Sequence, residues 1–163
     1  MGTVVSIHTA PAAGAAMVAR AEVRAVPGTG LDGDRYAAGE GAWQRRGTKP
    51  KQQMTLIELE ALEALVRDYQ ITLGEHETRR NITTEGVALN HLVGREFQVG
   101  DVRVRGLELC EPCGYLEEKT GKAVRAGLVH RGGLRCEILS EGVIRVGDAV
   151  GGCEVTVTCR DLH

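Results

Sequence analysis

The chain has 163 residues, the length of one ordinary domain. Its formal net charge of −2 argues against attraction of the whole surface to nucleic acid or to an anionic membrane, so any anion-binding site must be local. With 22 glycines and only 3% aromatic residues, the composition favours frequent tight turns and a core of aliphatic side chains.

The first third of the chain contains strand-like segments followed by an irregular region. Residues 3–9 form a β-branched run, and residues 18–26 alternate small or apolar side chains with charged ones at the period of a half-buried strand. A turn signal follows at residues 27–30. Glycines and charges then continue to Lys51 without periodicity, which predicts a long functional or mobile loop.

The clearest helix signal comes next. Thr55 and Glu58 have the spacing of a capping box, which predicts a helix that begins there. An apolar stripe then runs along one face of this predicted helix: Ile57, Ala61, Leu62, Leu65, Val66 and Tyr69.

The second half reads mostly as strands and turns. Residues 97–99 and 102–105 flank Gly100-Asp101, which is a good hairpin signal, and residues 114–128 could form a second helix. Further short strands are predicted at residues 134–139, 143–146 and 155–159. Short, closely spaced strands with one or two helices predict a mainly β (α+β) fold, a β-barrel with peripheral helices, in a single domain over residues 1–163.

The cellular compartment is predicted from the cysteines and the N-terminus. Five cysteines are an odd number, so they cannot all pair within one chain. The first ten residues show no basic region followed by an apolar one, and the alanine-rich stretch after them is interrupted by Pro11. We therefore expect a cytoplasmic protein with reduced thiols that binds neither membrane nor nucleic acid.

One pair of cysteines has the spacing of a reactive motif, Cys110-Glu111-Pro112-Cys113. A redox disulfide is one interpretation, but the thioredoxin fold places a proline opposite the motif, and Pro112 is the last proline here. A zinc site would need a second pair of ligands, whereas Cys136, Cys153 and Cys159 occur singly in strand-like runs typical of buried apolar cysteines. A loop that presents one reactive thiolate, or two merely structural cysteines, remain open.

Three basic clusters are candidates for anion binding. Arg79-Arg80-Asn81 with Thr83 and Thr84 offers guanidinium, amide and hydroxyl donors that suit a phosphate. Gly30 to Tyr36 combines an Asp-Gly turn with Arg35, and His130 to Arg135 brings three basic side chains around the flexible Gly132-Gly133 pair. Each cluster could equally be a solvated surface turn.

The order of these motifs resembles one family, the MOSC domain (the C-terminal domain of molybdenum cofactor sulfurases), over nearly the whole chain. The matching stretches are Gly33-Asp34-Arg35, Gln53 to Ile57, Arg79 to Ile82, Leu89 to Gly94, Val99 to Val102, Cys110 to Cys113, Arg131-Gly132-Gly133 and Gly142 to Asp148. The resemblance implies a β-barrel like the C-terminal domain of pyruvate kinase, in a short stand-alone member of the family.

The resemblance also implies a cofactor and its ligands. The later cysteine of the loop binds molybdenum in cofactor-binding members, so Cys113 would be the metal ligand and the catalytic residue. Arg79 and Asn81 match the family's Arg-x-Asn segment and would hold the phosphate of the pterin, while Arg80 lies where the family varies. The remaining predicted contacts are Thr83, Gly33, Asp34, Arg35, Arg131, Gly132 and Gly133.

The function implied by the resemblance is the two-electron reduction of N-hydroxylated compounds such as hydroxylaminopurines and amidoximes. Electrons would come from a separate flavoprotein or ferredoxin-type reductase, because the chain holds no module of that kind. The aminotransferase-like half of the larger sulfurases is missing, so no pyridoxal phosphate is expected. Two alternatives remain: a persulfide sulfur carrier for metal–sulfur cluster assembly, and a non-catalytic molybdenum cofactor binding or storage module.

Overall fold

The computed structural model describes residues 1–38 and 49–152. The strands are β1 (Gly2–Thr9), β2 (Val18–Arg20), β3 (Glu22–Val26), β4 (Gly30–Leu31), β5 (Met54–Glu58), β6 (Ile82–Glu85), β7 (Glu96–Val99), β8 (Val102–Leu109), β9 (Leu134–Ile138), β10 (Gly142–Arg145) and β11 (Ala149–Gly151). The α-helices are α1 (Leu59–Tyr69), α2 (Gly114–Thr120) and α3 (Arg125–Leu128), with 3₁₀ turns at Pro50–Gln52, Glu75–Glu77 and Leu89–Leu92.

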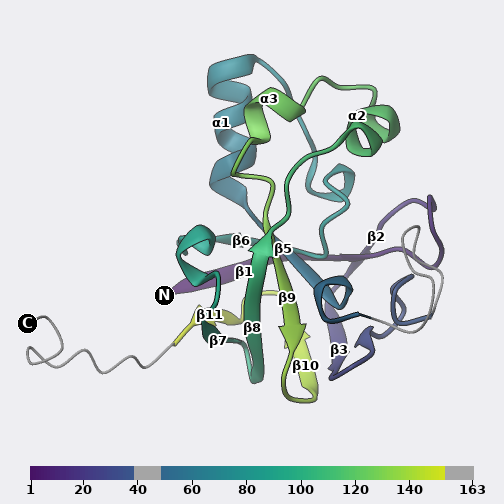
Figure 1. The fold of residues 1–163 in the computed structure, drawn as a ribbon, viewed down its shortest axis with the longest axis vertical. Helices are drawn as coiled ribbons and strands as arrows, with labels where there is room; N and C mark the ends of the chain where they lie inside the picture. Colours follow the sequence, from purple (N-terminus) through teal and green to yellow (C-terminus); the bar gives the residue numbers. More distant parts are fainter. Residues whose placement is uncertain (39–48, 153–163) are drawn as a thin grey trace, which may run out of the picture.

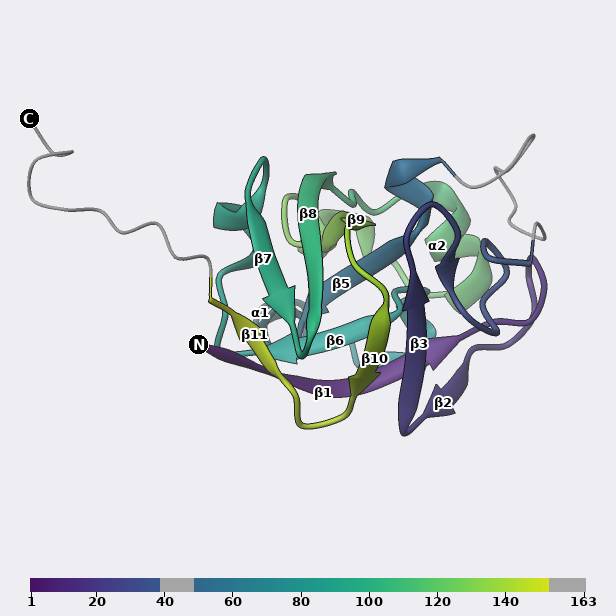
Figure 2. The same ribbon diagram turned by 90° about the horizontal axis from the view of Figure 1, so that it is seen from below.

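Seven strands close into a barrel in the order β11-β7-β8-β9-β5-β6-β1, because β1 also pairs with β11 (Figure 2). Neighbouring strands are antiparallel except for β5 and β6, which are parallel and are connected through α1. The short strand β2 extends the sheet beyond β1, and β10, β3 and β4 form a second, three-stranded sheet. Closure leaves few unpaired strand edges within the barrel.

Aliphatic side chains fill the barrel, as the composition predicts. Val102 and Val104 of β8 are fully buried, and Arg103 between them is exposed, which is the alternation of a strand with one face in the core. The core includes Val4, Ile7, Leu31, Met54, Leu56, Ile82, Leu89, Phe97, Val99, Leu134, Cys136 and Ile138. These findings confirm the predicted mainly β barrel with peripheral helices.

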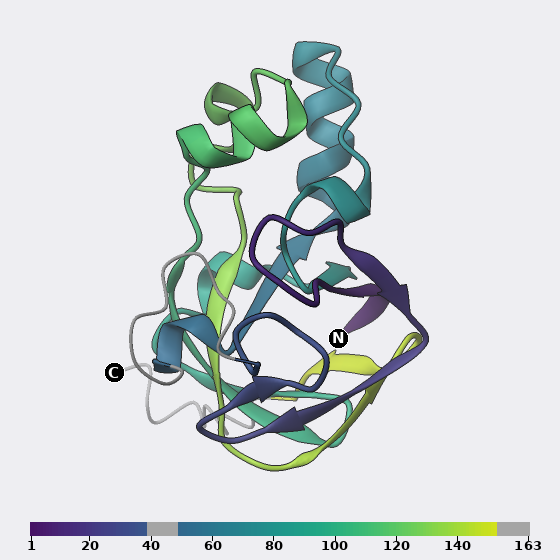
Figure 3. The ribbon, with the colours of Figure 1, turned by 90° about the vertical axis from the view of Figure 1, so that its right-hand side faces the viewer.

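A second, smaller core forms where the three α-helices gather at one end of the barrel (Figures 1 and 3). It contains Ile57 of β5, Leu62 and Leu65 of α1, Leu116 of α2 and Leu128 of α3. Helix α2 directly follows Cys113, so this helical core holds one end of the cysteine loop. Within residues 1–38 and 49–152, no helix is long and apolar enough to cross a bilayer.

The predicted start of the first helix was wrong. Residues 54–58 form β5, which is hydrogen-bonded between β6 and β9, and α1 begins only at Leu59. Thr55 therefore caps no helix, and no side chain caps α1 at Glu58. A run buried on both faces carries no strand alternation, so its apolar residues mimicked the first turn of the helix. The stripe is also narrower than predicted, because Val66 and Tyr69 are 49% and 48% exposed.

Two other predicted elements are divided. Residues 18–26 form two strands, β2 and β3, with Ala21 between them. Residues 114–128 form two helices, because Gly121 adopts a left-handed φ of 66° that ends α2. The predicted strand 155–159, with Cys153 and Cys159 around it, lies outside the described residues.

Candidate functional site

The Cys110–Cys113 loop leaves the end of β8 and leads into α2. Cys110 is buried at 2% exposure, whereas Cys113 is exposed. Cys113 adopts extended backbone angles at the residue before the helix, and its carbonyl oxygen accepts a 3.1 Å hydrogen bond from the Leu116 amide. The two cysteines therefore differ: one packs inside the protein and the other presents its thiol at the surface.

Two glycines before β9 let the backbone lie very close to its neighbours, Gly132 to this loop and Gly133 to β5. A Cβ on Gly132 would lie 2.2 Å from the Cys110 carbonyl oxygen, and a Cβ on Gly133 would lie 2.1 Å from the Leu56 carbonyl oxygen. No larger residue fits without moving the backbone. The Cys110 amide donates a 2.7 Å hydrogen bond to the Gly133 carbonyl oxygen, so the close approach anchors the loop.

The Arg80 side chain binds both the glycine segment and the cysteine loop. Its Nε donates to the Gly132 carbonyl oxygen at 2.7 Å, and its Nη2 donates to the Cys110 carbonyl oxygen at 3.1 Å. Its Nη1 donates to the Thr78 carbonyl oxygen at 3.2 Å. Arg80 is 8% exposed, and these three hydrogen bonds to carbonyl oxygens compensate its buried charge for the loss of water. Gly132 and Gly133 were predicted to bind the cofactor, but here their carbonyl oxygens accept hydrogen bonds from Arg80 and the Cys110 amide and so hold the cysteine loop.

A second anchor joins the loop to His130, two residues before this glycine pair. The His130 amide donates to Glu111 Oε2 at 3.0 Å, and His130 Nδ1 lies 3.1 Å from Glu111 Oε1. The hydrogen bond from the His130 amide lowers the pKa of the Glu111 carboxyl, and the His130 side chain lowers it further. Asn90 Nδ2 in turn donates to the His130 carbonyl oxygen at 2.7 Å.

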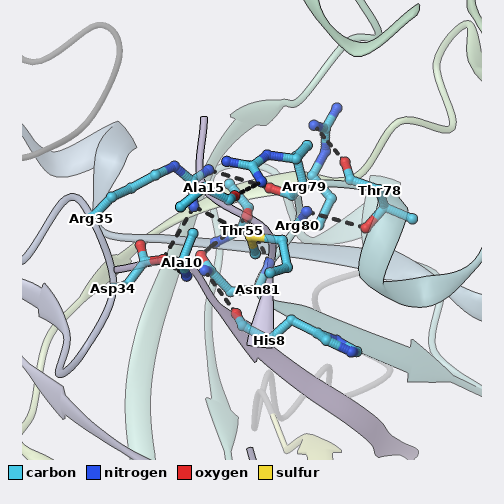
Figure 4. A network of polar contacts seen from close by, with 11 residues as sticks. His8, Ala10, Ala15, Asp34, Arg35, Thr55, Thr78, Arg79, Arg80 and Asn81 are labelled. Carbon is cyan, nitrogen blue, oxygen red and sulfur yellow. Dashed lines mark hydrogen bonds and ion pairs between the residues drawn. The ribbon is translucent and has the colours of Figure 1, made fainter. Parts of the chain in front are cut away.

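Asp34 and Arg35 form a buried pair beside the loop between β1 and β2. Asp34 is fully buried, and its Oδ1 accepts hydrogen bonds from the Ala10 amide and from Arg35 Nη1, both at 3.1 Å (Figure 4). The Arg35 guanidinium lies 4.7 Å from the centre of the Tyr36 ring. Asp34 thus fixes the direction of Arg35, and Gly33 supplies the left-handed turn (φ 85°) before it.

Arg79 is held in an unusual conformation near Arg35. Its backbone is left-handed with φ 62°, and its Nη1 donates to the Ala15 carbonyl oxygen (Figure 4). Its Nε is buried without a hydrogen-bond partner. Burial lowers the pKa of the Arg79 guanidinium, and the charge of Arg35 lowers it further. Two cations that repel each other, one with an unpartnered donor, form a place where an anion would be stabilised.

These side chains line a small cavity of about 70 Å³ at the foot of the cysteine loop. Its walls contain both loop cysteines, four arginines, one carboxylate and two tyrosines: Cys110, Cys113, Arg35, Arg79, Arg80, Arg135, Glu111, Tyr36 and Tyr115, with Gln52, Thr55 and Leu116. We call this cavity the arginine cleft. A cavity of about 330 Å³ shares four of these residues, and one of about 270 Å³ shares Arg79.

Seven predicted binding residues lie outside these walls: Gly33, Asp34, Asn81, Thr83, Arg131, Gly132 and Gly133. Asn81 is 2% exposed and its amide is used inside the protein: Oδ1 accepts from the Thr55 amide and hydroxyl, and Nδ2 donates to the His8 carbonyl oxygen. Asn81 therefore ties β1 to β5 (Figure 4). Thr83 is fully buried in β6. Arg131 lies near Glu58, where burial raises the pKa of the carboxyl and the Arg131 charge opposes that rise, and near Asp68, whose pKa is lowered mainly by its hydrogen bond with Arg67.

The cleft residues absent from the predicted set include Tyr36, Gln52, Tyr115 and Arg135. Tyr36 and Arg135 are the last residues of two basic clusters, Gly30 to Tyr36 and His130 to Arg135, but no binding role was assigned to them there. Gln52 belongs to a 3₁₀ turn, and Tyr115 lies in α2. Neither has a local pattern that marks it, because only the packing of distant segments brings them beside Cys113.

The other interpretations of the cysteines can be compared with the geometry. Cys136 is fully buried in β9, as expected for an apolar cysteine, and burial raises the pKa of its thiol. Within the parts of the chain that the structure describes, no three His, Cys, Asp or Glu residues are grouped so that they could hold a metal ion. The described residues therefore offer no support for a structural zinc site.

The fold and site together define a small closed β-barrel with helices at one end and an exposed thiol in an arginine-lined cleft. A sequence model of the MOSC domain matches residues 43–151. The chain belongs to the MOSC domain family, which in general is associated with the molybdenum cofactor.

Solved structures agree at the level of the fold. The YuaD protein from Bacillus subtilis is 15% identical, with a TM-score of 0.74 over 92% of this chain and 94% of that chain. YiiM from Geobacillus stearothermophilus is 15% identical, with a TM-score of 0.70 over 93% and 74%. YiiM from Escherichia coli is 16% identical, with a TM-score of 0.64 over 93% and 69%. Among curated protein sequences, no match was found.

Proposed function

We propose that this protein holds a molybdenum cofactor through Cys113 and reduces small N-hydroxylated compounds with electrons from a separate reductase. The observation that carries the proposal is the exposed Cys113 in the wall of a cleft with four arginines. MOSC membership supports the cofactor class. The reaction and its substrate come from the family resemblance.

The donor at position 113 suits a soft metal centre. A thiolate is an electron-rich ligand, and a single protein sulfur leaves coordination positions for other ligands. Cys110 is a poor alternative because its side chain is buried among the loop anchors. The hydrogen bonds from the Arg80 guanidinium to the Cys110 carbonyl oxygen and from the Cys110 amide to the Gly133 carbonyl oxygen would keep the Cys113 thiol in one place.

The cationic walls suit the anionic end of a pterin phosphate. Arg79 has a buried Nε without a partner, and the adjacent Arg35 guanidinium is directed by Asp34. Arginine presents a fork of donors that matches phosphate oxygens. We therefore assign Arg79 and Arg35 to the phosphate. Arg80 keeps mainly its role as an anchor, and Asn81 and Thr83 are not carried into the binding set.

The chemistry divides between the ligand and the chain. When bound, molybdenum would supply the two-electron redox chemistry that breaks the N–O bond. The overall change consumes two electrons and two protons and releases the amine or amidine and water. The chain's own residues hold the thiol, neutralise the phosphate and shape the cleft. The electrons require a partner protein of the flavoprotein or ferredoxin type.

The decisive experiment is metal and pterin analysis of protein purified from a host that makes the cofactor. We expect about one molybdenum per chain, loss of that metal in Cys113→Ala, and retention of most of it in Cys110→Ala. If Cys110→Ala is the damaging change, the ligand within the pair is misassigned. Stoichiometric molybdenum without reduction of an N-hydroxy substrate, given a competent electron donor, would instead indicate a storage module.

The exposure of Cys113 also suits a second function, a persulfide carrier. Such a carrier needs an accessible thiolate but no pterin pocket. Intact-mass analysis separates the two: a +32 Da adduct mapped to Cys113, with no metal, would support the carrier. A molybdenum-loaded protein without the adduct supports the reductase.

A further inference from the structure

A second cavity adjoins the arginine cleft on the other side of Cys113. It has a volume of about 330 Å³ and shares Tyr36, Gln52, Cys113 and Arg135 with the cleft. Arg35, Arg79 and Arg80 are not in its walls, and Lys51 and Glu108 are. The larger cavity therefore reaches Cys113 without the cation pair Arg35 and Arg79 in its walls.

The charges in this cavity are only loosely paired. Glu108 Oε1 lies 3.6 Å from Arg135 Nε and 3.9 Å from Lys51 Nζ, so two cations share one carboxylate oxygen at long range. Lys51 and Glu108 side chains are more than half exposed, and that of Arg135 is 31% exposed. Such exposed pairs hold each other weakly, so Arg135 can turn from Glu108 to a ligand at little cost.

The backbone of Arg135 is fixed within the sheet, although its guanidinium is only weakly paired. Arg135 lies in β9 between β5 and β8, opposite Thr55 on one side and Glu108 on the other. Tyr36 adds a ring, already contacted by the Arg35 guanidinium at 4.7 Å. A cation on a rigid strand and a ring nearby suit a small, flat compound that bears an oxygen anion.

We propose that the cavity formed by Tyr36, Lys51, Gln52, Glu108, Cys113 and Arg135 takes the substrate, and that Arg135 selects small compounds with a carboxylate or another anionic oxygen over cationic ones. This inference rests on the proposed function only in that the occupant is called the substrate. The binding preference itself requires neither metal nor turnover. Arg135 is thus a specificity-determining residue.

The test uses three ligands of nearly the same shape: benzoate, benzamide and benzamidinium, which carry negative, zero and positive charge. Each is titrated into the purified full-length chain and followed by NMR chemical shifts. We expect benzoate to bind roughly five- to tenfold more tightly than benzamide, the size of one charge-assisted contact at a partly exposed site. Benzamidinium should bind more weakly than benzamide.

Three variants show where the carboxylate of benzoate binds. Arg135→Gln should abolish the preference for benzoate, while Arg24→Gln should leave it intact. Arg24 is a matched control, because it is a strand arginine paired with a carboxylate at 3.6 Å and lies outside these cavities. If Arg79→Gln abolishes the preference and Arg135→Gln does not, the anion binds in the arginine cleft and the inference fails. Equal binding of all three ligands also overturns it.

A second readout ties the ligand to Cys113. Benzoate should slow alkylation of Cys113 by iodoacetamide, measured peptide by peptide so that other cysteines do not interfere, and the protection should vanish in Arg135→Gln. Benzoate binding without protection would put the ligand elsewhere. Loss of these effects in a protein that retains molybdenum overturns this inference alone, whereas intact effects in a protein that never binds molybdenum overturn the proposed function.

Discussion

Adjacent residues of one basic motif have different tasks in this protein. Arg80 directs three guanidinium nitrogens to the backbone carbonyls of Gly132, Cys110 and Thr78. Arg79 next to it makes one such bond, to Ala15, and buries a nitrogen without a partner. Because the left-handed backbone at Arg79 turns the chain, the two side chains diverge. Arg80 therefore supports the fold, whereas Arg79 is the neighbour that we propose for ligand binding.

Replacing each arginine should separate these tasks. Arg80→Ala should lower the free energy of unfolding by about 3 kcal/mol, because it removes charge-assisted bonds to buried carbonyls. Arg79→Ala should change stability much less but weaken cofactor retention by roughly 1.5–3 kcal/mol. Urea unfolding and pterin content measure the two effects, and Arg67→Ala, an exposed arginine of α1, is the control. Unchanged pterin content in Arg79→Ala would move the phosphate elsewhere.

At the scale of elements, the cysteine loop is held by the segment that precedes β9. Gly132 lets its backbone lie against the Cys110 carbonyl, and Gly133 lets the same segment lie against β5 at Leu56. The His130–Glu111 contact adds a side-chain anchor for the cysteine loop. Helix α2 holds the far end through Leu116. The exposed thiol is therefore mounted on an immobilised loop, which is what a metal ligand requires.

The Glu111 anchor predicts a pH dependence. Since the pKa of Glu111 is lower in the folded protein than its ordinary value, the anchor contributes stability above the unfolded pKa. That contribution is lost as the pH falls through the folded pKa. Wild type should therefore exceed Glu111→Gln in melting temperature at neutral pH, and the difference should vanish in acid. A difference that persists below about pH 3 would exclude the carboxylate as its source.

At the scale of the whole molecule, the protein has two hydrophobic cores, one inside the barrel and one among the helices. The barrel core supports the strands, whereas the helical core carries Leu116 two residues beyond Gly114, where α2 begins. The cleft lies between them, since its walls come from β5, β9, α2 and the loop after β4. Damage to either core should lower stability, but the helical core contains Leu116, which lies three residues from Cys113.

Leu116→Ala tests this division. We expect a loss of about 2–4 kcal/mol in unfolding free energy, as for other buried leucines, with faster amide hydrogen exchange in α2 and around Cys113. Leu89→Ala removes the same side chain from the barrel core and should cost a similar amount without the local increase in exchange. Equal exchange in both variants would show that the cysteine loop depends on global stability alone.

Local patterns by themselves determined much of the fold and the key residue. Alternation and turn residues predicted the β7–β8 hairpin, β9 and β10, and motif order predicted the family and singled out Cys113. These predictions succeeded because alternation, turn residues and motifs are all formed by residues that are close together in the chain. The buried strand β5 was mistaken for helix, since burial on both faces removes the alternation that identifies a strand.

Only the tertiary structure decided which polar residues face the cleft. In the sequence, Asn81 and Arg79 look equivalent as hydrogen-bond donors. In the structure, the Asn81 side-chain amide is hydrogen-bonded to Thr55 and His8, whereas Arg79 Nε has no partner. Gln52, Tyr115 and Arg135 join the site from segments far apart along the chain. Direction and burial are set by long-range packing, and no local spacing encodes them.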